Sequence, residues 1–218
     1  MCGRFAQTSS AQDYAELVGA TSGLDSKPQF NVTPDSSVVA ALQQEGELVL
    51  AQLRWNLVPQ WSKGPDSRFR MHNARAETLA EKPAFRSPFR KQRCLIPADG
   101  FYEWQNSAVG KQPYYIYKEG GEPMVFAGLW DSWQDSDDNL LRSCTIVTTA
   151  ANDLMQPIHH RMPVILPKEN WSQWLEDDNT LRLQALLLPY RKTNLCTHPV
   201  SKRVNNPANN DAELLNPV

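Results

Sequence analysis

Residues 38–53 read VVAALQQEGELVLAQL, and this stretch indicates most directly how the chain folds. Two runs of mostly aliphatic residues, 38–42 and 48–53, flank the turn dipeptide Glu45-Gly46, and this pattern predicts a β-hairpin. Further strand-like runs follow at 93–96, 114–118, 124–129, 143–149 and 162–166. Because these runs do not alternate with helices, we expect an α+β fold with a curved, barrel-like and mostly antiparallel β core.

Short helices are expected to flank this core. The first covers 10–19, where Ser10 and Asp13 resemble a capping box. A second helix is expected at 75–81 and should end before Pro83. A third is expected to begin near Lys168, and a fourth to cover 180–188. The segment Phe30–Pro34 is expected to form a loop. Since neither a repeat nor a linker divides the sequence, one domain spanning 1–218 is expected.

The composition is that of a globular protein with a modest charge. Of 218 residues, 41% are hydrophobic and 21% are charged, and the formal net charge is −2. No run approaches ~18 apolar residues, so a membrane span is not expected. The first residues lack the apolar region of a secretion signal, which favours a cytoplasmic protein. The four cysteines are scattered without metal-binding spacing, so neither a disulfide nor a metal or other cofactor is expected.

Positive charge is concentrated in one part of the sequence. Between Lys63 and Arg93 there are nine basic and three acidic residues, a balance of +6, whereas 119–178 has three basic and eleven acidic residues, a balance of −8. This polarity favours one basic working face that binds a polyanion. Trp61 lies just before the basic segment, and exposed aromatic rings beside cations suit stacking on single-stranded bases. Core packing is the alternative, and it applies more readily to Trp55.

Cys2 follows the initiator methionine, and methionine aminopeptidases generally remove Met1 before so small a residue. The product carries an α-amine and a thiol on adjacent carbons, with ordinary pKa values of about 8 and about 8.5. Such a 1,2-aminothiol condenses with an aldehyde: the amine forms a Schiff base, and the thiol closes it to a five-membered thiazolidine. An N-terminal nucleophile for amide hydrolysis is a second possibility, and a residue without a chemical role is a third.

Other segments carry polar side chains suited to acid–base chemistry or to substrate binding. Glu103 lies between aromatic residues, which would desolvate its carboxylate and raise its pKa, although an exposed turn glutamate is the commoner case. His159 and His160 precede a strand, and in an extended segment their side chains would point opposite ways. The Asn73 amide suits substrate binding and Arg75 suits a phosphate, with a helix cap and a surface cation as the alternatives.

The sequence lacks the common phosphate-loop, dinucleotide, zinc-protease and serine-hydrolase motifs. The segments that stand out occur instead in one order along nearly the whole chain. They are Met1-Cys-Gly-Arg-Phe5, Asn73-Ala-Arg-Ala-Glu77, Cys94-Leu-Ile-Pro-Ala-Asp-Gly-Phe-Tyr-Glu-Trp104, Thr148, His159-His-Arg-Met-Pro163, Pro199-Val-Ser201 and Asn216-Pro-Val218. Together they resemble the SRAP family, the SOS-response-associated peptidases.

The resemblance implies a monomer that senses abasic sites in single-stranded DNA on the nucleoid and crosslinks to them through an N-terminal cysteine. By motif match, the active-site residues would be Cys2, Asn73, Glu103 and His159. The positions that contact DNA would be Arg4, Asn31, Pro34, Trp61, Arg75, Thr148 and Arg161. Ser62 stands where some members carry a second aromatic residue. The family name also implies removal of a leader, although only Met1 precedes Cys2 here.

Three functions are therefore compared. A DNA–protein crosslinking enzyme at abasic sites needs a free N-terminal Cys2 and shields the site from strand cleavage. A cysteine peptidase or amidase using Cys2 with His159 and Glu103 would turn over peptides and leave no stable adduct. A non-catalytic single-stranded DNA-binding module would bind through Trp61 and Arg75 and tolerate Cys2→Ala. The ordered set of motifs favours the first function.

Overall fold

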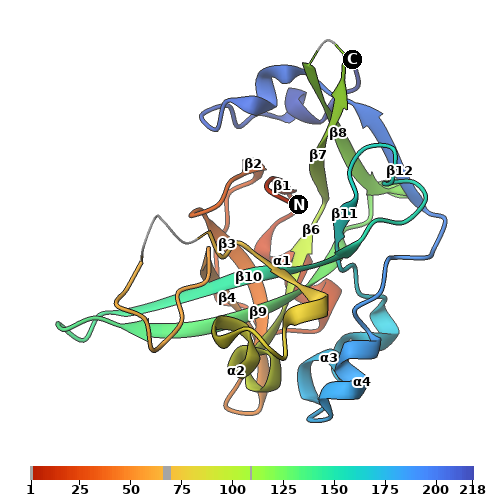
Figure 1. Ribbon diagram of the computed structural model, residues 1–218. Coiled ribbons are helices and arrows are strands. Elements are labelled where there is room, and N and C mark those ends of the chain that lie inside the picture. Colours follow the sequence, from red (N-terminus) through yellow and green to blue (C-terminus); the bar gives the residue numbers. More distant parts are fainter. Residues whose placement is uncertain (1, 66–69, 109) are drawn as a thin grey trace.

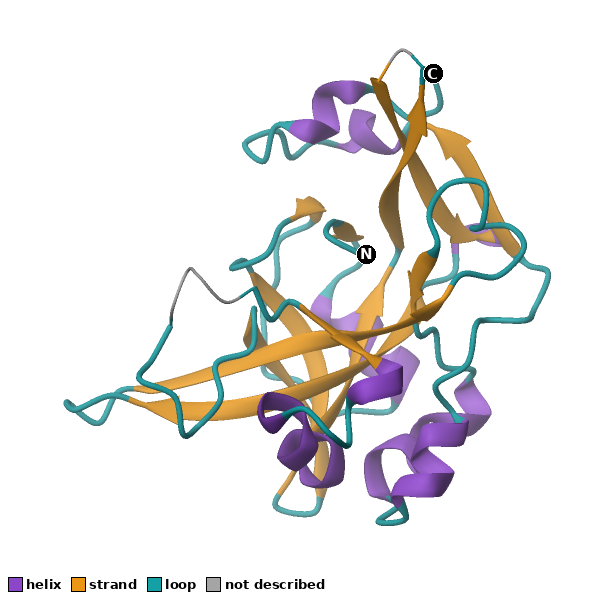
Figure 2. Ribbon diagram, in the orientation of Figure 1, coloured by secondary structure: helices purple, strands orange, loops and turns teal. Residues whose placement is uncertain are grey.

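The computed structural model describes residues 2–65, 70–108 and 110–218 (Figures 1 and 2). Its strands are β1 (Phe5–Gln7), β2 (Gln29–Val32), β3 (Ser37–Gln44), β4 (Glu47–Trp55), β5 (Asn73–Arg75), β6 (Arg93–Ala98), β7 (Gly100–Ser107), β8 (Gly110–Lys118), β9 (Met124–Gln134), β10 (Leu140–Ala150), β11 (Arg161–Pro163) and β12 (Leu195–Pro199). Its α-helices are α1 (Ala11–Val18), α2 (Pro83–Lys91), α3 (Trp171–Glu176) and α4 (Thr180–Ala185). Its 3-10 turns are η1 (Ala76–Thr78), η2 (Glu119–Gly121), η3 (Lys168–Asn170), η4 (Lys202–Asn205) and η5 (Ala212–Leu215). None of the helices in these described ranges is long and apolar enough to span a membrane.

Five of the strands close into a barrel. Neighbouring strands pair in the order β10–β4–β3–β6–β9, and β9 pairs again with β10, which completes the ring. The pairing of β10 with β4 is parallel, and the other four pairings are antiparallel. Strands β3 and β4 form the predicted hairpin, and both Glu45 and Gly46 adopt a positive φ at its turn. The predicted α+β class with a barrel-like, mostly antiparallel core is confirmed.

The alternation of side chains along the barrel strands creates two apolar faces. Val39 and Leu95 belong to the outer face, where they form one cluster with Tyr14 of α1, Phe89 of α2 and Trp174 of α3. The alternate residues of the same strands face inward and form a separate cluster. The helices therefore cover the outside of the barrel (Figure 2), and its interior is a packed core.

A second antiparallel sheet, in the order β12–β8–β7–β1–β2, packs against the barrel. Phe5 of β1 and Phe101 of β7 belong to the same cluster as the inward-facing barrel residues, and Phe5 meets Trp55 edge to face at a centroid distance of 4.9 Å. The opposite face of this sheet presents Tyr102, which packs with Val204 of the C-terminal segment. The N-terminal strand is thus held between the barrel and the C-terminal segment (Figure 1).

Several local predictions are wrong. The helix expected at 75–81 is only the 3-10 turn η1, and Pro83 begins α2 instead of ending a helix. Proline suits that position because its missing N–H would have no helical partner in the first turn. The segment expected to be a loop at Phe30–Pro34 contributes its first residues to β2, where Val32 pairs with Phe5. These elements depend on partners that are remote in the sequence, which a local pattern does not record.

Candidate active site

Cys2 precedes β1 and is fully buried in the core shared by the barrel and the second sheet. The pairing of β1 with β7 fixes this segment, and the Tyr102 N–H donates to the Arg4 carbonyl at 2.9 Å. Burial raises the pKa of the Cys2 thiol well above its ordinary value, and the negative charge of Glu103 acts in the same direction. The thiol is therefore protonated at neutral pH and needs a base before it can react. Met1, whose removal is expected, lies outside the described residues.

Asn73 is brought to Cys2 by the short strand β5, which runs parallel to β10. Ala74 faces the helix-covered side of the sheet, so Asn73 and Arg75 face the opposite side, where Cys2 lies. The Asn73 amide nitrogen donates to the Cys2 carbonyl oxygen at 2.7 Å. The amide oxygen of Asn73 is buried and has no hydrogen-bond partner among the described residues. Asn73 therefore fixes the main chain of Cys2 and retains an acceptor for a nearby N–H group.

Glu103 is buried on β7, with only 3% of its surface exposed, and it shares a sheet face with Phe101. Burial raises the pKa of its carboxyl group, as the aromatic neighbours in the sequence predicted. The carboxyl oxygen Oε1 lies 4.0 Å from Nδ1 of His159. Because its charge also acts on the Cys2 thiol, Glu103 can exchange protons with groups on both sides of the site.

His159 follows a turn-rich segment and is partly buried, which lowers its pKa. The guanidinium of Arg161 acts in the same direction, whereas the hydrogen bond to the Arg161 backbone raises the pKa. The Arg161 backbone N–H lies 3.0 Å from Nδ1 and the Arg161 carbonyl oxygen lies 3.2 Å from it, so the main chain of Arg161 holds this ring nitrogen. The expectation that the two histidine side chains point opposite ways is wrong, because their rings stack at a centroid distance of 4.4 Å. The segment is not extended at this point, and His160 is exposed.

A row of predicted DNA-contacting residues continues from Asn73 across the same sheet face. Thr148 pairs with Arg75 in the ladder, and Arg161 donates to the Thr148 carbonyl oxygen at 2.6 Å. Arg161 also forms a bidentate ion pair with Glu77, at 2.5 and 3.0 Å. The sequence assigns no partner to Glu77, because Arg161 lies 84 positions away. Arg75 is exposed, whereas Thr148 is fully buried and braces the row.

Arg4 and Asn31 meet on the other side of Cys2. Arg4 donates to the Asn31 side-chain oxygen at 2.7 Å and to the Val204 carbonyl at 2.6 Å. The Asn31 amide also donates to three carbonyls of the C-terminal segment, those of Val204, Asn206 and Asn209. Asn31 is thus a buried strand residue that ties the N-terminal strand to the tail. Nothing in the sequence marks the tail as a partner of these residues. Pro34 lies in the turn that follows β2 and is half-buried.

Trp55 and Trp61 differ in exposure as the sequence favoured. Trp55 is fully buried, and Trp61 is 68% exposed. The basic segment does not form one working face. Arg93 is buried and donates to carbonyls of α2 and of the α3 region, including those of Phe89 at 2.9 Å and Asp177 at 2.7 Å. The cations of α2 lie on a helix that covers the outer side of the barrel, whereas Arg75 faces the Cys2 side. Arg68 lies outside the described residues.

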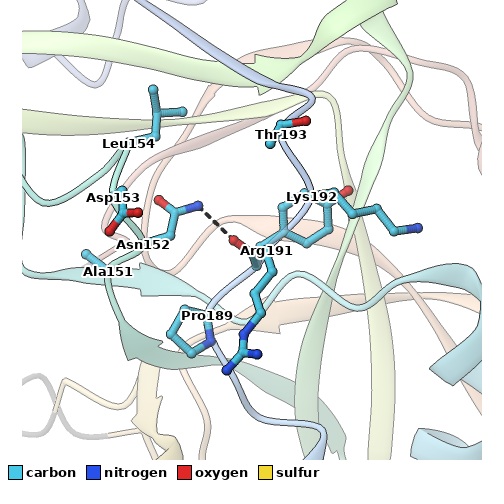
Figure 3. Close-up of a pocket in the computed structure, with 9 residues that line it drawn as sticks. Ala151, Asn152, Asp153, Leu154, Pro189, Arg191, Lys192 and Thr193 are labelled. Carbon is cyan, nitrogen blue, oxygen red and sulfur yellow. Dashed lines mark hydrogen bonds between the residues drawn. The ribbon is translucent and has the colours of Figure 1, made fainter.

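A pocket of about 470 Å³ lies apart from these residues (Figure 3). It is lined by Ala151–Leu154 and by Pro189–Thr193. The Asn152 side chain donates to the Tyr190 carbonyl at 2.9 Å across its floor, as the dashed line in Figure 3 shows. The Asn152 carbonyl also accepts from the Met155 N–H at 3.0 Å, and the Met155 carbonyl accepts from the His159 N–H at 2.8 Å. The pocket wall thus shapes the turn that leads to His159.

The four cysteines are free. Within the described ranges, no group of three or more His, Cys, Asp or Glu side chains is arranged to hold a metal ion. The groups that come together at the site are the thiol of Cys2, the amide of Asn73, the carboxyl group of Glu103 and the imidazole of His159.

This fold and this arrangement of motifs define a class of protein. The chain belongs to the SRAP family, since the family model for SOS response associated peptidases matches residues 1–207. Abasic site processing protein YoqW of Bacillus subtilis (strain 168) is 42% identical over 221 residues, covering 99% of both chains. Abasic site processing protein HMCES of Xenopus tropicalis is 34% identical and covers 87% of this chain and 66% of its own length.

Solved structures show the same architecture. A crystal structure of a protein from Bacteroides thetaiotaomicron is similar over 100% of both chains, with a TM-score of 0.89 and 27% sequence identity. A phage-related protein from Bordetella bronchiseptica has a TM-score of 0.74 and 30% identity over 92% of this chain and 95% of that chain. The barrel and the second sheet are therefore a fold that this chain shares with experimentally determined proteins.

Proposed function

We propose that this protein recognises abasic sites in single-stranded DNA and forms a thiazolidine crosslink to them through Cys2, once Met1 has been removed. The observation that carries the proposal is the convergence of four groups. Asn73 holds the Cys2 carbonyl at 2.7 Å, Glu103 lies 4.0 Å from His159, and the charge of Glu103 acts on the Cys2 thiol. The names of relatives that match 99% of the chain describe abasic site processing. A ring-opened abasic sugar carries an aldehyde, the group that an aminothiol captures.

The first stage produces a Schiff base. In its protonated form His159 donates a proton to the ring oxygen of the closed sugar, and the C1′ hydroxyl group loses its proton to solvent, so that the ring opens and the aldehyde at C1′ is freed. The Cys2 α-amine attacks C1′, and its direction is set through the Cys2 carbonyl that Asn73 holds. Glu103 gives a proton to the departing hydroxyl group, so that one water leaves. The raised pKa of Glu103 suits this step, because a carboxyl group that titrates closer to neutral pH is protonated more often.

The second stage closes the ring. Glu103 has just lost its proton and accepts the proton of the buried Cys2 thiol, whose raised pKa makes such a base necessary. The sulfur bonds to C1′, the electrons of the C=N bond move to nitrogen, and nitrogen keeps the proton that it carried in the iminium. The product has the atoms of protein and DNA minus one water. Because C1′ is then saturated, the iminium that promotes β-elimination of the strand is no longer present.

The DNA strand is held along the exposed parts of the row that begins at Asn73. Arg75 offers an exposed cation to phosphates, Arg161 would exchange its ion pair with Glu77 for a phosphate, and the exposed ring of Trp61 offers a stacking surface. Binding is therefore expected to weaken as salt increases, because phosphate contacts release counterions. An unstacked, bent strand costs less to form without a complementary strand, by a few kcal/mol per unstacked step. This difference favours single-stranded DNA as the substrate.

The test uses labelled single-stranded DNA with one abasic site, resolved on a denaturing gel. The parent protein should give a heat-stable adduct without a reducing agent, and an undamaged strand should give none. Cys2→Ser retains the α-amine but lacks the thiol, so its adduct should require borohydride trapping of the Schiff base. Turnover of peptides without an adduct would support a peptidase instead, and binding unaffected by Cys2→Ala without any adduct would support a plain DNA-binding module. No adduct from protein confirmed to begin at Cys2 would overturn the proposal.

A further inference from the structure

Asp35 follows Pro34 in the turn after β2, and its carboxylate holds this turn in place. The backbone of Asp35 has an unusual conformation. Asp35 has a φ of 76°, in the left-handed region that few residues other than glycine adopt. Its carboxylate accepts from the Arg54 guanidinium at 2.5 Å and from the Asn56 amide nitrogen at 3.1 Å. Its backbone N–H donates to the Trp55 carbonyl at 2.9 Å. The last residues of β4 and the residue that follows it therefore fix the position of this turn.

The oxygen of the Asn56 side-chain amide fixes the residues that lead into β5. The Asn56 side-chain oxygen accepts from the Met71 N–H at 2.7 Å, and the Met71 carbonyl accepts from the Leu57 N–H at 3.2 Å. The next carbonyl, that of His72, accepts from the Trp55 indole at 2.8 Å and from the Ile146 N–H at 3.0 Å. We call these hydrogen bonds, together with those to Asp35, the clamp. Asn73 directly follows residues 71–72, so the clamp sets where the Asn73 amide meets the Cys2 carbonyl.

We propose that Asn56 is a positioning residue that holds the Pro34 turn and the Asn73 strand in one fixed relation. Asn56 is only 7% exposed, and one amide bridges the two segments with a donor at one end and an acceptor at the other. An aspartate in its place has no donor for Asp35, and an alanine has neither group. The inference rests on the proposed function, since it assigns Pro34 to the DNA side of the site and Asn73 to the chemical side.

The two ends of the amide can be tested separately. Asn56→Asp keeps an acceptor for Met71 but places a second carboxylate beside Asp35, which loosens the Pro34 turn. Asn56→Ala removes both contacts. The exposed Asn106 on β7 supplies matched controls, Asn106→Asp and Asn106→Ala, which make the same chemical changes outside the clamp. All variants are measured well below their melting temperatures by single-turnover adduct formation over a series of abasic DNA concentrations.

For Asn56→Asp, the DNA concentration at half-maximal rate should rise about tenfold, because a hydrogen bond to a charged group is lost, while the maximal rate stays within about twofold of the parent. For Asn56→Ala, the maximal rate should also fall about tenfold, because Asn73 loses its fixed position. The Asn106 variants should match the parent. If both Asn56 variants only melt earlier and keep parental kinetics, Asn56 is merely structural and the inference is wrong. If the parent itself forms no adduct, the proposed function fails, and this inference fails with it.

Discussion

Replacing Asn73 tests how the site orients its nucleophile. The Asn73 amide nitrogen donates to the carbonyl of Cys2 and not to its α-amine, and this carbonyl belongs to Cys2 whether or not Met1 is present. Two covalent bonds separate the carbonyl carbon from the α-nitrogen, so a fixed carbonyl restricts the direction of the amine. Asn73→Ala removes this donor and leaves a buried carbonyl oxygen without it. The same change removes the free acceptor of the amide.

The magnitude follows from the hydrogen bond that is lost. A neutral hydrogen bond contributes about 0.5–1.5 kcal/mol, and an orphaned buried acceptor costs about 1–3 kcal/mol. We therefore expect Asn73→Ala to lower the free energy of unfolding by about 1–2 kcal/mol. If a similar loss applies to the transition state, the maximal crosslinking rate falls about fivefold to thirtyfold, since about 1.4 kcal/mol corresponds to a factor of ten.

The assay is single-turnover adduct formation at saturating abasic DNA, with thermal unfolding measured in parallel. Asn73→Asp serves as a matched variant, because it keeps the size of the side chain and an acceptor but loses the donor. Both variants should be slow if the bond to the Cys2 carbonyl is what matters. A parental maximal rate in Asn73→Ala, in protein that begins at Cys2, would refute the reasoning.

Three further predictions concern the charged groups. Burial raises the pKa of Glu103 in the folded protein, so folding favours the protonated carboxyl group. This preference adds to the free energy of unfolding below the unfolded pKa of about 4.3, and the contribution is lost as pH rises through the folded pKa. Glu103→Gln should therefore raise the melting temperature relative to the parent more at pH 8 than at pH 4, and a difference independent of pH would contradict this. Arg93→Ala should lower the free energy of unfolding by about 3 kcal/mol or more in urea titrations, because several buried carbonyls lose a charged donor, and an effect below about 1 kcal/mol would be inconsistent with its burial. Arg75→Gln should weaken DNA binding and reduce its salt dependence, whereas Arg86→Gln and Arg90→Gln on α2 should leave both unchanged in fluorescence anisotropy titrations.

The sequence predicted those parts of the fold that local chemistry determines. The β3–β4 hairpin follows from two aliphatic runs around Glu45-Gly46, and the start of α1 follows from the mutual capping of Ser10 and Asp13. The burial of Glu103 was one of two alternatives: its aromatic neighbours favoured desolvation, although an exposed turn glutamate is the commoner case. In each case the determining residues lie within a few positions of one another.

The remaining features depend on contacts between distant segments. Strand β5 has three residues and exists because β10 pairs with it, about seventy positions away in the sequence, as the partners Asn73 and Ile146 show. Arg93 belonged by sequence to a basic run, yet the carbonyls of α2 and of the α3 region make it a buried structural residue. The stacking of His159 on His160 likewise required the turn geometry of the preceding segment.

The central claim is that the amine and the thiol of Cys2 become bonded to one carbon of the abasic sugar. Intact-mass analysis of the adduct, with and without borohydride treatment, tests it most directly. The account predicts the mass of the chain lacking Met1 plus the DNA minus one water, unchanged by borohydride because a thiazolidine contains no C=N bond. An adduct that gains two hydrogens on borohydride treatment, or one that forms equally with Cys2→Ala, would contradict the account.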